Sequence, residues 1–181
     1  RHSLRFLKRK TQADLVIVNG ENVSGTGMMG YLTVPKISQE LPVYHGTSDS
    51  VLAIAVGHFQ GTSLPVGGEG THCAVSAHRG LPTAVLFTHL DRMELGDLFY
   101  FTVADRTITY EVDQIRIVEP NVIQDLLIQE GKDLCTLITC TPYGINSHRL
   151  LVRGHRIANI EEAKRIREAG IKGMILVTCV V

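Results

Sequence analysis

The sequence contains no tryptophan, and aromatic residues make up only 6% of its 181 residues. Its four cysteines include no C-x-x-C pair, which excludes a structural zinc site of the common kind. The glycine-rich stretch 61–70 lacks the G-x-x-x-x-G-K-[ST] pattern of phosphate-binding loops, so we interpret it as a plain loop. We therefore expect neither a metal ion nor a cofactor.

The sequence also lacks a net charge, because its 18 basic and 18 acidic residues cancel. No basic stripe is interleaved with aromatic residues, so we expect no nucleic-acid partner. The basic N-terminus is not followed by the apolar core of a signal peptide. The longest terminal apolar run, Met174–Val181, is too short to span a bilayer by itself, which takes about 20 residues. It is either the first turns of a membrane anchor or a terminal strand.

What the sequence does contain is a series of short apolar or alternating runs bounded by turn residues, the pattern of β-strands. Two of them, Phe99–Val103 and Thr107–Ile117, are joined by Ala-Asp-Arg and predict a hairpin. The other strands that we expect are Asp14–Val18, Tyr31–Val34, Leu41–Tyr44, Cys73–Ala77, Leu134–Cys140 and Arg149–Ile157.

Helices are few in this pattern. We expect one at Val51–Val56, capped by Ser48, one at Ala84–Met93, and a charged one at Ile160–Ala169. About eight short strands with two small helices between them indicate a mainly β fold, a closed or nearly closed mixed β-barrel. The length fits one domain.

The most informative stretch is T-L-I-T-C-T-P-Y-G-I-N-S-H-R-L-L-V-R-G, residues 136–154. It begins as a strand that ends at Cys140, turns at Pro142, Gly144 and Asn146, and continues as a strand from Arg149. A thiol at a strand end is held rigidly and can still be reached. If the two strands are neighbours, Arg149 returns beside Cys140, and the pair suggests a nucleophile with a fixed positive donor for an oxyanion.

Other residues compete for these roles. The remaining cysteines, Cys73, Cys135 and Cys179, are interpreted as small core residues. Cys135 and Cys140 lie five apart on one strand and point to opposite faces, so they cannot pair locally.

Two further side chains are rivals of the residues beside Cys140. Arg153 lies on the same face as Arg149 and is the rival for the cationic role. His78, at another strand end, is the best imidazole partner for Cys140, and His148 is its main rival.

The stretch 136–154 resembles the sortases, the cysteine transpeptidases of Gram-positive cell surfaces, and their class C, pilus-assembling branch in particular. The resemblance covers about Gly27 to Ile157. It includes four further segments in the family's order: M-G-Y-L-T-V-P-K-I from Met29, L-P-V-Y-H-G-T from Leu41, V-G-H-F-Q-G-T-S-L-P from Val56 and V-S-A-H-R-G-L-P from Val75. It implies the eight-stranded sortase barrel, with short helices in the connections.

The resemblance also implies an activity. Cys140 attacks the Thr–Gly carbonyl of an LPXTG-like sorting signal, His78 protonates the departing amine, and Arg149 steadies the carbonyl or oxyanion. A lysine amine of a pilin subunit then resolves the thioacyl-enzyme. Two alternatives stay open: a housekeeping-type sortase that anchors proteins to the cell wall, and a non-catalytic surface or pilus-associated module.

The expected organisation has three parts: residues 1–26 as a lead or lid-like segment, 27–157 as the catalytic domain, and 158–181 as a helix followed by the start of a possible membrane anchor. The resemblance places the enzyme on the extracellular face of the membrane, held by that anchor. Two features depart from class C. No Asp-Pro pair exists for the usual Asp-Pro-aromatic lid, and Ala77 stands where glycine is commoner. We therefore expect an open or differently covered active site.

Overall fold

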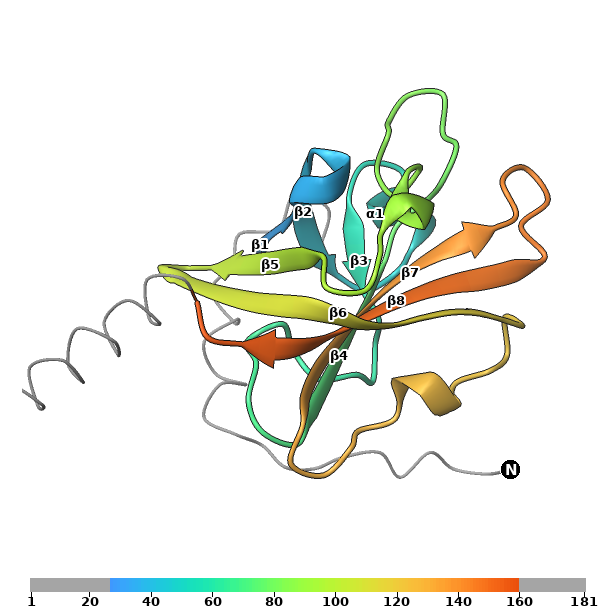
Figure 1. The fold of residues 1–181 in the computed structure, drawn as a ribbon. Coiled ribbons are helices and arrows are strands. Elements are labelled where there is room, and N and C mark those ends of the chain that lie inside the picture. Colours follow the sequence, from blue (N-terminus) through green and yellow to red (C-terminus); the bar gives the residue numbers. More distant parts are fainter. Residues whose placement is uncertain (1–26, 160–181) are drawn as a thin grey trace, which may run out of the picture.

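The structure, a computed structural model, describes residues 27–159 as a closed barrel of eight strands (Figure 1). The order around the barrel is β1-β2-β3-β4-β7-β8-β6-β5. The strands are β1 Met28–Val34, β2 Gln39–His45, β3 Val56–His58, β4 Thr71–Ser76, β5 Leu98–Val103, β6 Arg106–Val118, β7 Asp133–Thr141 and β8 His148–Ile157. The predicted fold class is confirmed.

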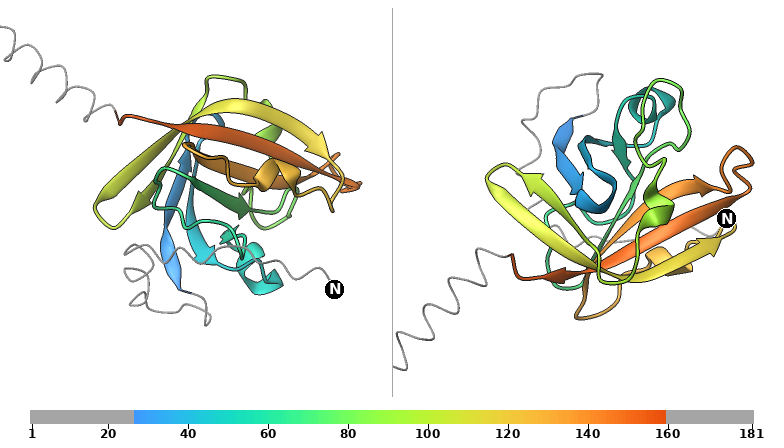
Figure 2. Two further views of the ribbon diagram at one scale, coloured as in Figure 1. Left: turned by 90° about the horizontal axis from the view of Figure 1, so that it is seen from below. Right: turned by 45° about the horizontal axis from the view of Figure 1, so that its top comes forward.

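Within residues 27–159, helical structure is limited to single turns between the strands. These are the α-helix α1 Asp49–Leu52 and the 3-10 turns η2 Pro35–Ile37, η3 Leu90–Arg92 and η4 Gln124–Leu126. The connections between the strands are therefore mostly loops, which lie at the ends and on the outside of the barrel (Figure 2).

Strand β7 lies between β4 and β8. It pairs in parallel with β4, where Ser76 is opposite Ile138, and antiparallel with β8, where Cys140 is opposite Arg149. Successive residues of a strand point to opposite faces. On β7, Cys135 and Leu137 thus point into the barrel, while Ile138 and Cys140 point outward.

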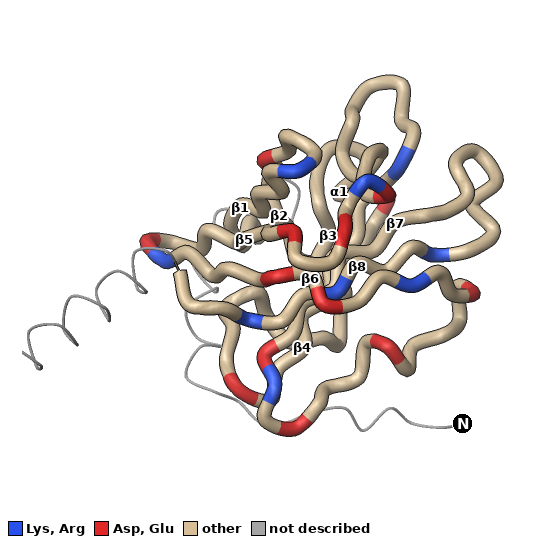
Figure 3. The backbone as a smooth tube through the Cα atoms, viewed as in Figure 1, with Lys and Arg blue, Asp and Glu red and all other residues tan. Residues whose placement is uncertain are grey.

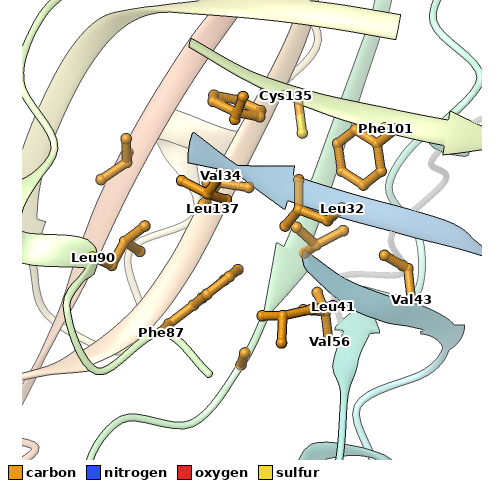
Figure 4. Close-up of a cluster of buried hydrophobic side chains, with 14 of the residues drawn as sticks. Leu32, Val34, Leu41, Val43, Val56, Phe87, Leu90, Phe101, Cys135 and Leu137 are labelled. Atoms are coloured by element: carbon orange, nitrogen blue, oxygen red, sulfur yellow. The ribbon is translucent and has the colours of Figure 1, made fainter. Parts of the chain in front are cut away.

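The inward residues form the main core, in which Phe87, Phe101 and Leu137 are fully buried (Figure 4). A second, smaller cluster lies on the outer face of the sheet. It consists of the buried Ala74, Val118, Ile138 and Leu151, with Val122 and Leu126 of the β6–β7 segment packed against it. The outer face beside Cys140 is therefore apolar and covered on one side.

The strands were predicted better than the helices. The hairpin is confirmed, with a two-residue connection between Val103 and Arg106. Strand β3 was missed, because three residues are too few to show a period. The helix expected at Ala84–Met93 is wrong: only η3 is helical there. Leu86, Phe87 and Leu90 are spaced as in a helix, but each is buried separately from a loop, and Leu86 has a φ of 41° that no α-helix accepts.

The helix expected at Val51–Val56 is displaced. Helix α1 begins after Ser48, as predicted, but ends at Leu52 because Val56 already belongs to β3. The Ser48 hydroxyl bonds to the Ser50 hydroxyl and caps no backbone N–H.

Several expectations lie outside the described residues: the strand at Asp14–Val18, the helix at Ile160–Ala169, the apolar tail and a lid formed by residues 1–26. Within residues 27–159, no helix is long and apolar enough to cross a membrane. The same residues contain no group of three or more His, Cys, Asp or Glu side chains arranged to hold a metal ion. Basic and acidic residues are interspersed along this part of the chain (Figure 3).

His72 fastens the β6–β7 segment to the barrel. Its side chain is fully buried, its Nδ1 lies 3.0 Å from the Leu127 carbonyl oxygen, and its Nε2 lies 2.8 Å from the Thr136 hydroxyl. A carbonyl can only accept, so Nδ1 donates to Leu127 and Nε2 of the neutral ring accepts from Thr136. Burial lowers the pKa of His72 more than the Leu127 carbonyl raises it.

We predict that this histidine makes the fold sensitive to acid. Because the folded pKa lies below the ordinary value of about 6.5, the unfolded chain binds the proton first as the pH falls through that value. Stability from His72 is complete above about pH 6.5 and decreases below it, by at most about 1.4 kcal/mol per pH unit. Urea unfolding at pH 7.5 and 5.5 measures the loss. A His72→Gln variant should lose less over this interval, and an equal loss in both proteins would contradict the assignment.

Candidate active site

Cys140 is the next-to-last residue of β7, and its thiol is half-buried on the outer face of the barrel. Arg149, the second residue of β8, is its direct cross-strand partner. Side chains of such partners start about 5 Å apart and point to the same face. The register of β7 and β8 therefore places Arg149 beside Cys140, as the sequence predicted.

His78 follows β4, the strand on the other side of β7. Beyond Ser76, Ala77 continues along β7: its N–H donates to the Ile138 carbonyl at 3.2 Å, and its own carbonyl accepts from the Thr139 hydroxyl at 2.9 Å. Ser76 is opposite Ile138 in the register of β4 and β7. His78 lies two residues after Ser76, and Cys140 lies two residues after Ile138. The half-buried His78 reaches the level of Cys140 on the neighbouring strand.

The three side chains are brought to one level of three adjacent strands, β4, β7 and β8. Among the described residues, no hydrogen bond joins Cys140 to His78 or to Arg149. Catalytic groups are often loosely aligned before substrate binds, so this spacing is compatible with a catalytic role.

Arg149 is positioned by the turn that precedes it. Its Nη1 donates to the carbonyls of Asn146, at 3.1 Å, and His148, at 3.0 Å. Asn146 has a φ of 61°, a left-handed conformation that asparagine tolerates. Among residues 27–159, Arg149 has no carboxylate partner, so its charge remains available to a substrate oxygen.

The rivals for these roles are occupied elsewhere. Arg153 forms a two-pronged ion pair with Asp113, with Nε and Nη2 at 2.8 and 3.0 Å from the carboxylate oxygens. His148 points to the opposite face from Arg149, as predicted, and its Nδ1 lies 2.8 Å from the Ser147 hydroxyl. Cys73 and Cys135 are buried, as expected of core residues, and Cys179 lies outside the described residues.

Sequence reasoning missed one contact that joins the two loops of the site. Arg79, directly after His78, bonds through Nη2 to Asp91 at 2.6 Å and lies over the Tyr143 ring, 5.6 Å from its centroid. Gly80 touches the same ring: a Cβ atom there would lie 2.8 to 3.0 Å from Tyr143 atoms. These contacts hold the loop after β4 against the loop after β7, at the same end of the barrel (Figure 1).

We predict that Tyr143 positions His78 relative to Cys140. Tyr143→Ala removes the ring that packs on Arg79 and Gly80, and we expect kcat/KM for peptide cleavage to fall about tenfold, the scale of one cation–π contact. Tyr143→Phe keeps the ring face and should stay within about twofold of the unaltered protein. If both variants lost activity equally, the hydroxyl and not the ring contact would be responsible.

A small closed barrel with a half-buried cysteine near a strand end, opposite an arginine, fits a cysteine-dependent acyl-transfer enzyme. The chain belongs to the sortase family: the family described as Sortase domain matches residues 32–157. Sortases are cysteine transpeptidases that act at the cell surface. A curated relative, sortase D of Bacillus subtilis (strain 168), is 29% identical over 131 residues, which are 71% of this chain. The chain spans 63% of the length of that relative.

Solved structures are more similar. Sortase C1 of Streptococcus suis is 53% identical with a TM-score of 0.73, and the match covers 74% of each chain. Sortase C of Streptococcus pneumoniae is 57% identical with a TM-score of 0.72, covering 73% of this chain and 70% of the other. The predicted resemblance to class C sortases and the eight-stranded barrel are confirmed.

Proposed function

We propose that this chain is a pilus-polymerising transpeptidase. It cleaves an LPXTG-like sorting signal between threonine and glycine and transfers the threonine carbonyl to a lysine amine of a pilin subunit. The observation that carries the proposal is the placement of Cys140 opposite Arg149 of β8 and level with His78, which follows β4. The structure of the S. pneumoniae sortase C, which is more than half identical, gives insights into pilin substrate specificity.

The proposed reaction has two halves. The Cys140 thiolate attacks the threonine carbonyl carbon, and Arg149 donates to the oxyanion that forms. As this intermediate collapses, the carbon–nitrogen bond breaks, His78 protonates the glycine amine, and a thioester remains. A lysine amine then attacks the thioester, gives up its proton, and releases Cys140 with an isopeptide bond formed.

The outer apolar cluster supports a peptide substrate. Ile138 and Leu151 are the next outward pair along β7 and β8 from Cys140 and Arg149, and Leu126 packs over them. Val122 and Leu126, which cover this buried pair, are half-buried and would give an extended peptide with its scissile bond at Cys140 apolar surface for its leucine and proline.

The alternatives are weaker. A housekeeping-type anchoring sortase is disfavoured because identity exceeds 50% to the two sortases C and is 28% to the sortase A of Bacillus anthracis. A non-catalytic module would not need a cationic side chain left unpaired by acids next to a reachable thiol. We further propose that the apolar tail at Met174–Val181 begins a membrane anchor that keeps the enzyme at the cell surface.

Removal of the nucleophile tests the proposal. Cys140→Ala should reduce cleavage of a fluorogenic LPXTG-like peptide by at least about a thousandfold, because no covalent intermediate can form. Cys73→Ala is the matched control and should retain cleavage, since that thiol is buried in the core. Cleavage by the Cys140→Ala protein would exclude Cys140 as the nucleophile.

The two arginines provide the second test. Arg149→Lys should lower kcat roughly a hundredfold, the scale of losing an oxyanion donor, because lysine keeps the charge but not the planar fork. Arg153→Lys should leave kcat within about threefold and lower the unfolding midpoint instead, since its fork binds Asp113. The reverse pattern of losses would exchange the two roles.

A further inference from the structure

Two cysteines outside the candidate active site lie side by side in the core. Cys73 on β4 and Cys135 on β7 are directly opposite each other in the parallel register. Both belong to the main core cluster, with exposed fractions of 2% and 0%. Figure 4 shows the Cys135 sulfur among the buried side chains, near Phe101.

Paired strands lie about 4.8 Å apart, and a disulfide joins Cα atoms that are 4.4–6.8 Å apart. The two side chains leave their strands toward the same interior, the main core cluster. The backbone geometry thus allows a bond between the two sulfurs without moving either strand.

His58 makes the two thiols unequal. Burial alone raises the pKa of the Cys73 thiol, but the neighbouring Cys135 and His58 outweigh burial and lower that pKa to about 6. For Cys135, burial and the neighbouring Cys73 both raise the pKa. Because the thiolate is the nucleophile in thiol–disulfide exchange, Cys73 is the attacking sulfur and Cys135 the resolving one once β4, β7 and His58 have come together during folding.

We propose that Cys73 and Cys135 form a structural disulfide when the enzyme folds in the presence of a small-molecule disulfide oxidant. Cys73 attacks one sulfur of the oxidant and forms a mixed disulfide, and the first oxidant thiol leaves with the proton of Cys73. Cys135 then attacks the Cys73 sulfur, and the second oxidant thiol leaves with the proton of Cys135. The protein loses two hydrogens, and the oxidant is reduced to two thiols.

The bond would tie together the two strands that carry the proposed catalytic groups. Cys73 lies five residues before His78, and Cys135 lies five residues before Cys140. A sulfur bridge closes a loop of about 60 residues and so restricts the unfolded chain more than the folded one. Since both thiols are buried, we expect rapid bridging during refolding and slow bridging in the folded enzyme.

The test refolds the full chain with oxidised or with reduced glutathione. The Cys140→Ala/Cys179→Ala protein is used, because the tryptic peptide 133–149 contains both Cys135 and Cys140 and would otherwise leave the bridge ambiguous. After oxidation, we expect an intact mass about 2 Da lower, the Cys73 and Cys135 peptides linked, and an unfolding midpoint raised by roughly 5–10 °C and reversed by dithiothreitol.

Cys73→Ala and Cys135→Ala in the same background are the controls, and neither should show the mass loss or the rise in midpoint. The proposal is overturned if both thiols are still alkylated in denaturant after oxidation. It is equally overturned if the remaining cysteines carry glutathione but no linked peptide forms, or if the bridge forms without a rise in midpoint.

Discussion

The pairing of β7 with β4 on one side and β8 on the other is the constraint on which the rest of the structure depends. Backbone hydrogen bonds set Ser76 opposite Ile138 and Cys140 opposite Arg149. A shift of either pairing by one residue would turn every side chain of that strand to the other face. The buried Cys135 and Leu137 prevent such a shift, because it would move them from the core into solvent. Core packing thus fixes the geometry of the candidate site.

The alternation of side chains along β7 also places the residues that stabilise the fold and the proposed nucleophile on opposite faces of the strand. Inward residues of β7 fill the barrel, while outward residues support the substrate side, first with Ile138 and then with Cys140. The loops that follow the strands are fastened near the site: Thr139 binds the Ala77 carbonyl, and Arg79 lies over Tyr143. The register and these contacts thus place Arg149 opposite Cys140 and His78, just beyond β4, at the level of Cys140.

Local sequence signals predicted what depends on neighbouring residues. The β5–β6 hairpin, the strand that ends at Cys140 and the turn before Arg149 follow from alternation and turn residues. The failures have physical causes: β3 has three residues, and Leu86, Phe87 and Leu90 imitate a helix while packing from a loop. Contacts between segments that are distant in the chain produce no periodic pattern in the sequence. Neither the Arg79–Tyr143 contact nor the position of Cys73 opposite Cys135 could be predicted from the sequence, because both depend on β4 and β7 being parallel neighbours.

The central claim is that the register of three strands makes Cys140 the acyl-accepting thiol. Mass spectrometry after incubation with an LPXTG-like peptide, without any amine acceptor and at mildly acidic pH to slow hydrolysis, tests it most directly. The account predicts a mass gain equal to the peptide through its threonine, carried as a thioester on Cys140 and released by an added lysine-bearing peptide. An acyl group on Cys73, Cys135 or Cys179, or peptide cleavage without any acylated protein, would contradict it.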